Sequence, residues 1–249
     1  SGHVYVILQS MQNSLYVLPS SEIKQVQLEY EEWVNQQRQS LIEKFNITTR
    51  YDTITGSKTF LSPKPVSISR RHLRPKNKIN IINNYTVTDK ADGESALLYV
   101  SRSGKMYIIN HLLEFHDTGI TNIAYSGSLF NGELVTKTKD GMTCYDYMGY
   151  DAYIVKNKSC MEEPLMSLTD SESTRLRKLD AFVDSNQFTY KSTSKVAHPC
   201  RILAKTFYHT RPDKTIFELA KGIWSNRDTF RYKLDGLIFT PADKPVAFN

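Results

Sequence analysis

Lys90-Ala91-Asp92-Gly93 is the stretch from which both the fold and the chemistry of this chain are inferred. It lies between two segments with the residue pattern of β-strands, and Gly93 permits a tight turn that exposes the lysine. An amine attacks phosphorus only after it loses its proton, and a lysine ordinarily keeps that proton up to pH about 10.4. Nearby cations, a metal ion or partial burial favour the neutral amine. The same residues are also typical of a strand-end turn with a solvated lysine, so other motifs must decide between the two interpretations.

Two later segments each place an acid beside an apolar strand. Phe130-Asn131-Gly132-Glu133-Leu134-Val135 carries Glu133 within an apolar run, and Leu234-Asp235-Gly236-Leu237-Ile238-Phe239 carries Asp235 just before one. A buried strand rarely holds a lone acid without a partner. Taken singly, each acid favours a β-bulge or a turn. In order with Lys90, two carboxylates and a lysine are able to hold a divalent metal ion around a phosphoryl group.

The hydrophobic pattern of the chain predicts an α+β fold with mostly antiparallel twisted sheets flanked by helices. Apolar residues alternate in segments separated by tight turns, which is the pattern of strands and hairpins. These segments cover residues 4–18, 95–110, 128–156, 201–209 and 233–240. Helical spacing predicts three helices. The first covers residues 22–44, the second follows a capping box at Thr169 and Glu172, and the third follows a cap at Asp213.

The composition is that of a soluble globular protein, since 40% of the 249 residues are hydrophobic and 23% are charged. It excludes collagen-like chains, disordered acidic chains and disulfide mini-proteins. No apolar stretch approaches the roughly 20 residues that span a bilayer, so we expect no membrane partner. The three cysteines form no CxxC pair, and we therefore expect reduced thiols, an intracellular protein and no structural zinc site.

The formal net charge of +6 is unevenly distributed along the chain. Residues 53–88 contain seven Lys and Arg residues and no acid. Such a segment favours a basic surface for phosphates or a nucleic-acid backbone, with Arg70 and Arg71 as candidate contacts. A solvated loop with long side chains is the alternative.

Four motifs in a fixed order resemble those of the covalent nucleotidyltransferase superfamily, which contains mRNA capping enzymes and ATP-dependent DNA and RNA ligases. They are matched by Lys90-Ala91-Asp92-Gly93, Asn131-Gly132-Glu133, Tyr150-Asp151 and Asp235-Gly236-Leu237-Ile238. The resemblance implies an ATP-grasp-like DNA ligase/capping enzyme domain. Asn131 is a departure, because the family usually has Asp at this position.

Three strings have the form found in capping guanylyltransferases rather than in ligases: Pro65-Val66-Ser67-Ile68, Gly132–Val135 and Asp235–Pro241. The whole resembles the guanylyltransferase segment of capping enzymes from large DNA viruses of the African swine fever virus type. In that type the segment lies between an RNA triphosphatase and a methyltransferase, which would be its covalent neighbours together with an OB domain. The resemblance implies cytoplasmic viral replication sites as the location, with the virion as a second one.

The resemblance also implies a two-step reaction. Lys90 would attack the α-phosphate of GTP, release pyrophosphate and form a lysyl-N-GMP phosphoramidate, and the GMP would pass to a 5′-diphosphate RNA end. Mg²⁺ or Mn²⁺, bound by Glu133 and Asp235, would neutralise phosphate charge. The implied nucleotide contacts are Asp92, Gly93, Glu133, Tyr150, Lys205, Lys233 and Asp235, with Tyr150 stacked on the guanine. For Lys205 and Lys233, solvent exposure is the alternative.

Two departures from the family pattern limit the expected activity. Ser95 stands where many members have Arg, and Arg70, Arg71 or Arg102 could make the contact of that Arg instead. The lysine-rich motif that follows the last strand in the family, and its C-terminal OB domain, are absent by Asn249.

We expect a hairpin and helix over residues 1–50 that pack on the core or on a neighbouring domain. They precede a truncated nucleotidyltransferase domain over residues 51–249 that transfers GMP weakly.

Two other functions remain open from the sequence. The adenylation domain of an ATP-dependent polynucleotide ligase would use the same lysine chemistry. A non-catalytic RNA-binding domain that keeps the fold is favoured slightly by Ser95 and Asn131. The presence of Lys90, Glu133 and Asp235 favours an enzyme.

Overall fold

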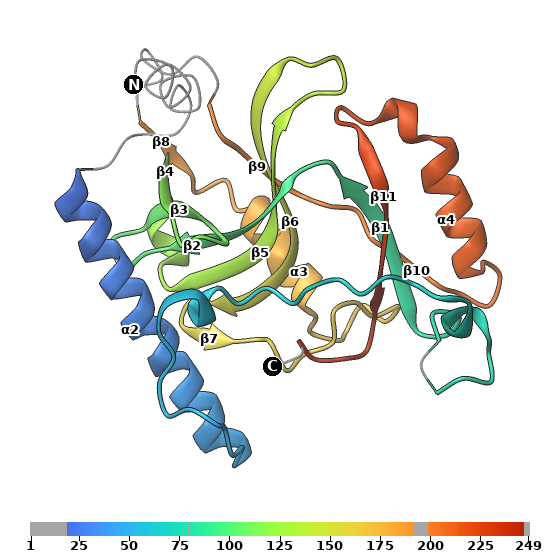
Figure 1. The fold of residues 1–249 in the computed structure, drawn as a ribbon, viewed down its shortest axis with the longest axis horizontal. Helices are drawn as coiled ribbons and strands as arrows, with labels where there is room; N and C mark the ends of the chain where they lie inside the picture. The colour runs from blue at the N-terminus through green and yellow to red at the C-terminus, as the bar shows by residue number, and fades with distance from the viewer. Residues whose placement is uncertain (1–18, 79, 192–198, 247–249) are drawn as a thin grey trace.

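The computed structural model describes residues 19–78, 80–191 and 199–246 (Figure 1). Within these ranges the fold is α+β, with two curled, mostly antiparallel sheets and three α-helices, as the hydrophobic pattern predicts. No helix in the same ranges is long and apolar enough to cross a membrane. The hairpin predicted for residues 4–18 lies outside the described residues.

The larger sheet has the strand order β7-β6-β5-β2-β3-β4-β8, and β9 pairs with β6 in parallel. Its strands are β2 (Glu94–Val100), β3 (Lys105–Asn110), β4 (Phe115–Thr121), β5 (Ser128–Lys137), β6 (Thr143–Val155), β7 (Lys158–Ser159), β8 (Thr189–Tyr190) and β9 (Arg201–Ala204). The two predicted hairpins are confirmed as β2–β3 and β5–β6. They form the centre of the sheet, because β2 also pairs with β5.

Helices cover both faces of the larger sheet. Helix α2 (Ser20–Phe45), predicted for 22–44, places Tyr30 and Trp33 against Tyr99, each with ring centroids 5.1 Å apart. Helix α3 (Arg175–Val183) lies on the opposite face, where Phe182 stacks on Phe130 with centroids 4.2 Å apart. Alternate residues of each strand point to opposite faces, so one sheet serves both helices.

The predicted cap of α3 at Thr169 and Glu172 is wrong. The helix begins at Arg175, and the side chain of Thr174 accepts a hydrogen bond from the Arg177 backbone N–H. The guanidinium of Arg177 donates to the backbone carbonyls of Thr169, Asp170 and Glu172. These carbonyls are thereby held in a turn, because they hydrogen-bond to a side chain instead of to a following helical turn.

The smaller sheet has the order β10-β1-β11, formed by β1 (Tyr85–Ala91), β10 (Tyr208–His209) and β11 (Leu234–Pro241). The last strand confirms the one predicted over residues 233–240. The strand predicted over 201–209 is wrong as one element, because β9 ends at Ala204 and β10 joins the other sheet. The chain therefore crosses from one sheet to the other within this segment.

Helix α4 (Ile216–Ser225) packs its apolar face on the smaller sheet, at the right of Figure 1. Its cap is Thr215, whose side chain and Glu218 form a capping box, and not Asp213 as predicted. Asp213 lies instead in the turn closed by the bridge between Arg211 and Lys214. The same apolar cluster includes Met148 of β6, so it joins the two sheets.

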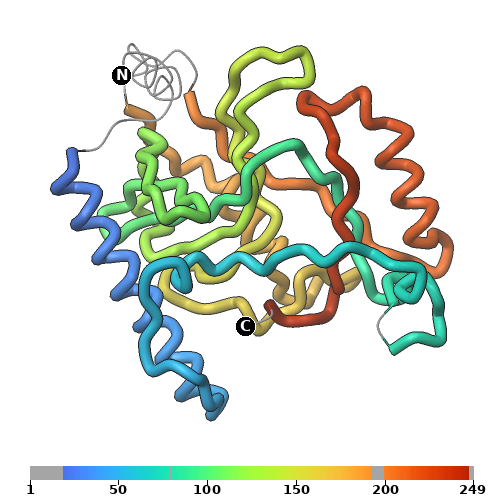
Figure 2. Tube along the Cα trace, in the orientation of Figure 1, coloured from blue at the N-terminus to red at the C-terminus, as the bar shows by residue number. Residues whose placement is uncertain are grey.

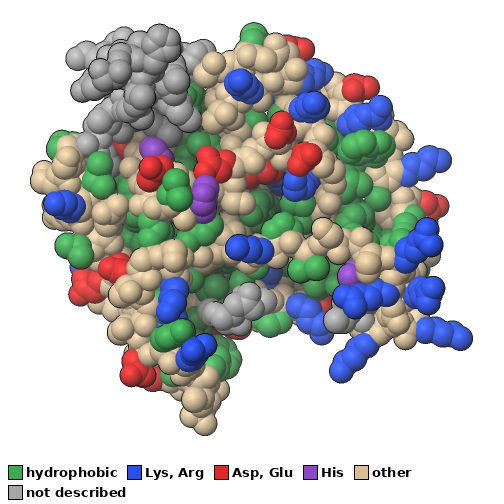
Figure 3. All heavy atoms as spheres, in the orientation of Figure 1, with side chains coloured by type: hydrophobic (Ala, Val, Ile, Leu, Met, Phe, Trp, Pro, Cys, Tyr) green, Lys and Arg blue, Asp and Glu red, His purple; other side chains and the backbone are tan. Residues whose placement is uncertain are grey.

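The basic segment connects α2 to the smaller sheet and contains the 3-10 helices η1 (Gly56–Thr59) and η2 (Arg70–Leu73). Figure 2 shows this segment crossing the front of the molecule from α2 toward β1. Arg70, Arg71 and Arg74 are exposed at its far end, and Lys and Arg side chains gather at the lower right of Figure 3 over this part of the chain. The Lys and Arg side chains of the segment are exposed, which agrees both with the predicted basic surface and with the solvated loop considered as its alternative.

Candidate active site

Lys90 is the next-to-last residue of β1, where the chain leaves the smaller sheet for β2. Opposite it, Lys90 pairs with Gly236 and Ala91 pairs with Leu234, so Asp235 is an extra residue in β11. Such a β-bulge re-aims a side chain that a regular ladder would point elsewhere. The Nζ atom of Lys90 donates to Oδ2 of Asp235, and the two side chains are 39% and 58% exposed. The β-bulge considered as an alternative for Asp235 is therefore present, and it brings the Asp235 carboxylate into hydrogen-bond contact with the candidate nucleophile Lys90.

The Lys90–Asp235 pair has a clear electrostatic consequence. The hydrogen bond and the charge of Lys90, with a smaller contribution from Lys233, hold the pKa of the Asp235 carboxyl below its ordinary value. Asp235 is therefore ionised at neutral pH. Lys233 is exposed, and its carbonyl accepts a hydrogen bond from the Asp92 backbone N–H at 3.1 Å, which ties the loop after Lys90 to β11.

Glu133 and Lys205 form a buried ion pair behind Lys90. Their side chains are 8% and 0% exposed, and Nζ of Lys205 contacts Oε1 of Glu133. The same Oε1 accepts a hydrogen bond from the Ala91 backbone N–H at 3.2 Å, directly after Lys90. The lone acid in β5 thus has the partner that its burial requires. Solvent exposure, the alternative considered for Lys205, is wrong.

Asp89 completes this buried cluster, and sequence reasoning missed it. Its Oδ2 lies 3.2 Å from Nζ of Lys205, and its backbone carbonyl accepts from the same Nζ at 2.8 Å. The Tyr232 hydroxyl donates to Oδ2 of Asp89 at 2.9 Å. Like Glu133, Asp89 is an acid within a strand, but Lys90 follows it directly, so the strand segment is not otherwise uncharged. Two carboxylates therefore share one ammonium beside the candidate nucleophile.

Gly93 is required by the close approach of β5 and not by an unusual turn. Its φ is not positive, so the conformational freedom expected from the sequence is not what the site uses. A Cβ atom at Gly93 would lie 2.9 Å from the Leu134 carbonyl oxygen and 3.3 Å from Oε2 of Glu133. A side chain here would push β5, with Glu133, away from the loop. Asp92 is exposed beside it.

Tyr150 is placed by a second β-bulge, in β6. Asn131 pairs with Asp151 and Gly132 pairs with Gly149, so Tyr150 is the extra residue between them. Burial raises the pKa of the Tyr150 hydroxyl to about 12, although hydrogen bonds with Ser62 and Ser95 act in the opposite direction. The hydroxyl is therefore neutral, and the small Ser95 side chain at the usual Arg position meets it.

Asn131, the departure from the family motif, is explained by its hydrogen bonds. Its side chain is buried, and Nδ2 donates to the Tyr153 hydroxyl at 2.8 Å and to Oγ of Ser62 at 3.3 Å. Its Oδ1 accepts from the Gly132 backbone N–H at 3.0 Å. An ionised Asp could only accept from these two hydroxyls, so Asn131 reverses the direction of both hydrogen bonds. Asn131 thus links Ser62, which meets Tyr150, to the strand that carries Glu133.

The structure does not bring Arg70 and Arg71 to Lys90. They lie in η2, in the teal segment beside the start of β1, whereas Lys90 lies near the other end of that strand (Figure 1). Their role in binding RNA stays a prediction. Among the described residues, no group of three or more His, Cys, Asp or Glu side chains is placed to hold a metal ion.

Comparisons with known proteins agree with the motifs. No curated protein matches the chain in sequence. A solved chain from a structure-function analysis of Lig E DNA ligases, described as binding DNA with a minimal scaffold, is 13% identical to this chain, with a TM-score of 0.38. That match covers 68% of this chain and 59% of the ligase chain. Residues 15–249 match the family described as mRNA capping enzyme, catalytic domain. The chain belongs to the mRNA capping enzyme catalytic domain family.

Proposed function

We propose that this chain is an mRNA guanylyltransferase domain that forms a lysyl-N-GMP intermediate on Lys90. The observation that carries the proposal is the arrangement around Lys90. Its partly exposed amine pairs with Asp235, which a β-bulge positions, and the buried cluster of Asp89, Glu133 and Lys205 lies next to it. Membership in the capping enzyme family and the capping form of the motifs support GTP as the nucleotide.

In the first step, Nζ of Lys90 loses its proton and forms a bond to the α-phosphorus of GTP. The bond from this phosphorus to the bridging oxygen breaks, and pyrophosphate leaves with the electron pair. Asp235 orients the amine and passes its proton to solvent, since Asp235 accepts the hydrogen bond from Nζ and is exposed. In the second step, a terminal oxygen of the RNA 5′-diphosphate attacks the same phosphorus, the P–N bond breaks, and Lys90 regains a proton.

Mg²⁺ or Mn²⁺ belongs to the proposal, and Asp235 is the residue that fits it. Mg²⁺ is usually held by one or two carboxylates together with substrate phosphates, and Asp235 is exposed. Glu133 fits less well, because its Oε1 already accepts from the Lys205 ammonium and the Ala91 N–H. When bound, the ion would neutralise charge on the phosphates.

The remaining nucleotide contacts follow from position. Tyr150, fixed by Ser62 and Ser95, offers its ring to guanine, and the exposed Lys233 is next to Asp235 for phosphates. We propose that Arg70 and Arg71 bind RNA beyond its 5′ end. The motifs alone suggest origin in a large DNA virus and covalent neighbours with triphosphatase, OB and methyltransferase activities. They likewise suggest a location at cytoplasmic replication sites and in the virion.

Labelling with nucleotides tests the proposal. The chain is incubated with α-³²P-labelled GTP or ATP and Mg²⁺, and the adduct is identified by mass spectrometry and by its lability to acid and stability to alkali. We expect labelling by GTP only, at a lower yield than for a longer chain that carries an OB domain. Lys90→Ala should abolish it, whereas Lys221→Ala, an exposed lysine on α4, should not. Labelling by ATP only would assign a ligase-type function. The absence of any adduct, even in the longer chain, would assign a non-catalytic RNA-binding role.

A further inference from the structure

A groove of about 610 Å³ lies beside the candidate active site, and its lining includes Ser62, which meets Tyr150. The groove is formed by the second half of α2, residues 47–63, Met161 and Val246. None of the residues placed above in the buried cluster lines it. Most of its lining is apolar, and among the described residues that line it the only charged ones are Arg38, Arg50 and Lys58, with no acid. The size is that of a specific binding pocket, and the charges select an anion.

Arg38 carries a hydrogen-bond donor that has no acceptor. Its Nη1 atom is buried, and it has no partner in the part of the chain that the structure describes. A buried donor without an acceptor is destabilising, more so when the group is charged. Arg38 lines the groove, and the planar fork of its guanidinium matches a carboxylate, so a carboxylate in the groove would pair with Arg38.

The other two cations are held at the rim of the groove by Tyr51. Nζ of Lys58 lies 3.6 Å from the centroid of the Tyr51 ring, and Cζ of Arg50 lies 5.5 Å from it. Tyr51 is 40% exposed and the neighbouring Ile47 is 43% exposed. Exposed apolar groups next to Arg and Tyr are typical of a surface that binds another protein.

We propose that this groove binds an acidic peptide segment of a partner protein. One apolar side chain of the segment fills the groove, one carboxylate pairs with Arg38, and further carboxylates pair with Arg50 and Lys58. A polyphosphate is less suited, because it has no apolar group for a groove whose lining is mostly apolar.

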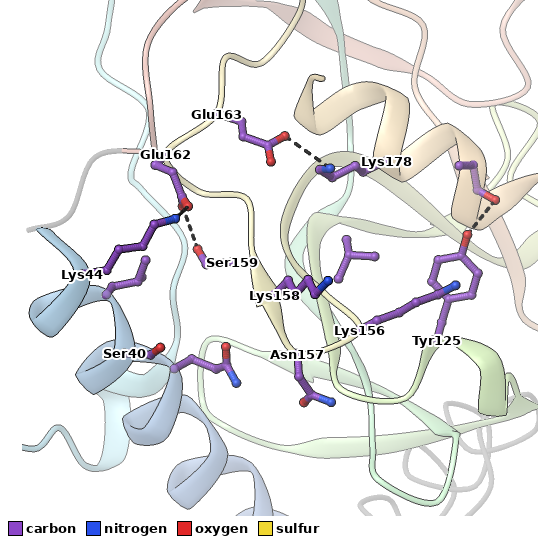
Figure 4. Close-up of a pocket in the computed structure, with 14 residues that line it drawn as sticks. Ser40, Lys44, Tyr125, Lys156, Asn157, Lys158, Ser159, Glu162, Glu163 and Lys178 are labelled. Atoms are coloured by element: carbon purple, nitrogen blue, oxygen red, sulfur yellow. Dashed lines mark hydrogen bonds and ion pairs between the residues drawn. The ribbon is translucent and has the colours of Figure 1, made fainter. Parts of the chain in front are cut away.

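A neighbouring cleft provides the matched control. This cleft of about 640 Å³ lies between α2, the β6–β7 turn and α3, and it is lined by four lysines and two glutamates (Figure 4). Lys44 pairs with Glu162 at 3.1 Å and Lys178 pairs with Glu163 at 3.4 Å, so acids within the cleft compensate part of its positive charge. Lys158, exposed at this cleft, is the control position for the loss of one positive charge.

The experiment measures fluorescence anisotropy of a set of fluorescein-labelled nonapeptides. Each has Asp and Glu at the flanking positions and Leu, Phe, Met or Ser at the centre. The Leu, Phe and Met peptides should bind about tenfold more tightly than the Ser peptide, since only they place an apolar side chain in the groove. Arg38→Gln should weaken binding by about tenfold and Lys58→Gln by less. Lys158→Gln should change nothing.

Stability separates a binding role of Arg38 from a structural one. Because Nη1 has no internal partner, Arg38→Gln should keep the Tm or raise it. A clear drop in Tm would assign Arg38 to the fold and overturn the proposal. Equal weakening by Lys158→Gln, equal affinity for the Ser peptide, or equal displacement by tripolyphosphate would show unspecific attraction and also overturn it. So would a Kd weaker than about 1 mM for every peptide, or binding only by a chain shortened to end at Val246.

Discussion

Replacing Lys205 by Met tests whether the buried charges beside Lys90 hold the candidate active site together. Met keeps most of the side-chain volume and removes the ammonium. The carboxylates of Asp89 and Glu133, which are 5% and 8% exposed, then lose their shared cation. The Tyr232 and Thr88 hydroxyls still donate to Asp89, and the Ala91 N–H still donates to Glu133.

The expected cost follows from the number of charges left without a partner. Removing one member of a buried ion pair costs about 3–5 kcal/mol. One ammonium here serves two carboxylates, so we expect Lys205→Met to lower the free energy of unfolding by about 4–5 kcal/mol at pH 7.

Urea unfolding followed by circular dichroism measures these free energies at pH 7. Lys221→Met, at an exposed position on α4, should stay within about 0.5 kcal/mol of the wild type. Adding Asp89→Asn and Glu133→Gln to Lys205→Met should recover at least half of the loss. A loss below about 1 kcal/mol for Lys205→Met, or a triple variant as unstable as the single one, would refute the reasoning.

Three further predictions address single features of the site and the core. Gly93→Ala should lower the Tm and the GTP labelling, because its Cβ would lie 2.9 Å from a backbone carbonyl of β5. Gly222→Ala is the control, because a Cβ there has open space, and it should keep or raise the Tm. Equal Tm values for the two variants would contradict this. Lys90 lowers the pKa of the Asp235 carboxyl. The pair therefore stabilises the folded state at a pH above the ordinary pKa of Asp, and this contribution is lost as the pH falls through the lowered pKa of Asp235. In Lys90→Ala, ¹³C NMR should show the Asp235 titration rise toward the ordinary value of about 3.9, and an unchanged midpoint would rule the pairing out. Burial raises the pKa of Cys160 to about 12, so its thiol should react with a disulfide reagent at pH 8 only as the protein unfolds, and fast reaction in the native state would disprove its burial.

The elements that could be predicted from the sequence are those whose signals are local. Tight turns at residues 103–104 and 139–141 fix the two central hairpins, and the helical spacing of α2 extends over several turns. The errors lie where tertiary contacts decide. The side chain of Arg177 holds the segment before α3 in a turn, and residues 201–209 divide between two sheets. Neither contact leaves a periodic pattern in the sequence.

The residue types of the candidate site could be predicted from the sequence, but their contacts could not. The motifs identified Lys90, Glu133 and Asp235, but not the partners that these residues have. Glu133 meets Lys205 because β9 runs parallel to β6, a pairing between strands far apart in the chain. Asp89 was overlooked because its neighbour Lys90 accounts for a charge at that point in the strand. Ion pairs between strands that lie far apart in the chain require the three-dimensional arrangement, which residue types alone do not specify.

Two β-bulges explain how regular strands come to form an irregular site. In an unbroken ladder, side chains alternate strictly between the two faces of a sheet, so a strand presents to one face only every second residue. The extra residues Asp235 in β11 and Tyr150 in β6 interrupt this alternation in two of the four motifs. One brings a carboxylate to Lys90, and the other brings a phenol to Ser95. The sheets therefore supply the rigid frame, and the residues that depart from their regular pairing supply the groups that meet at the candidate nucleophile and beside it.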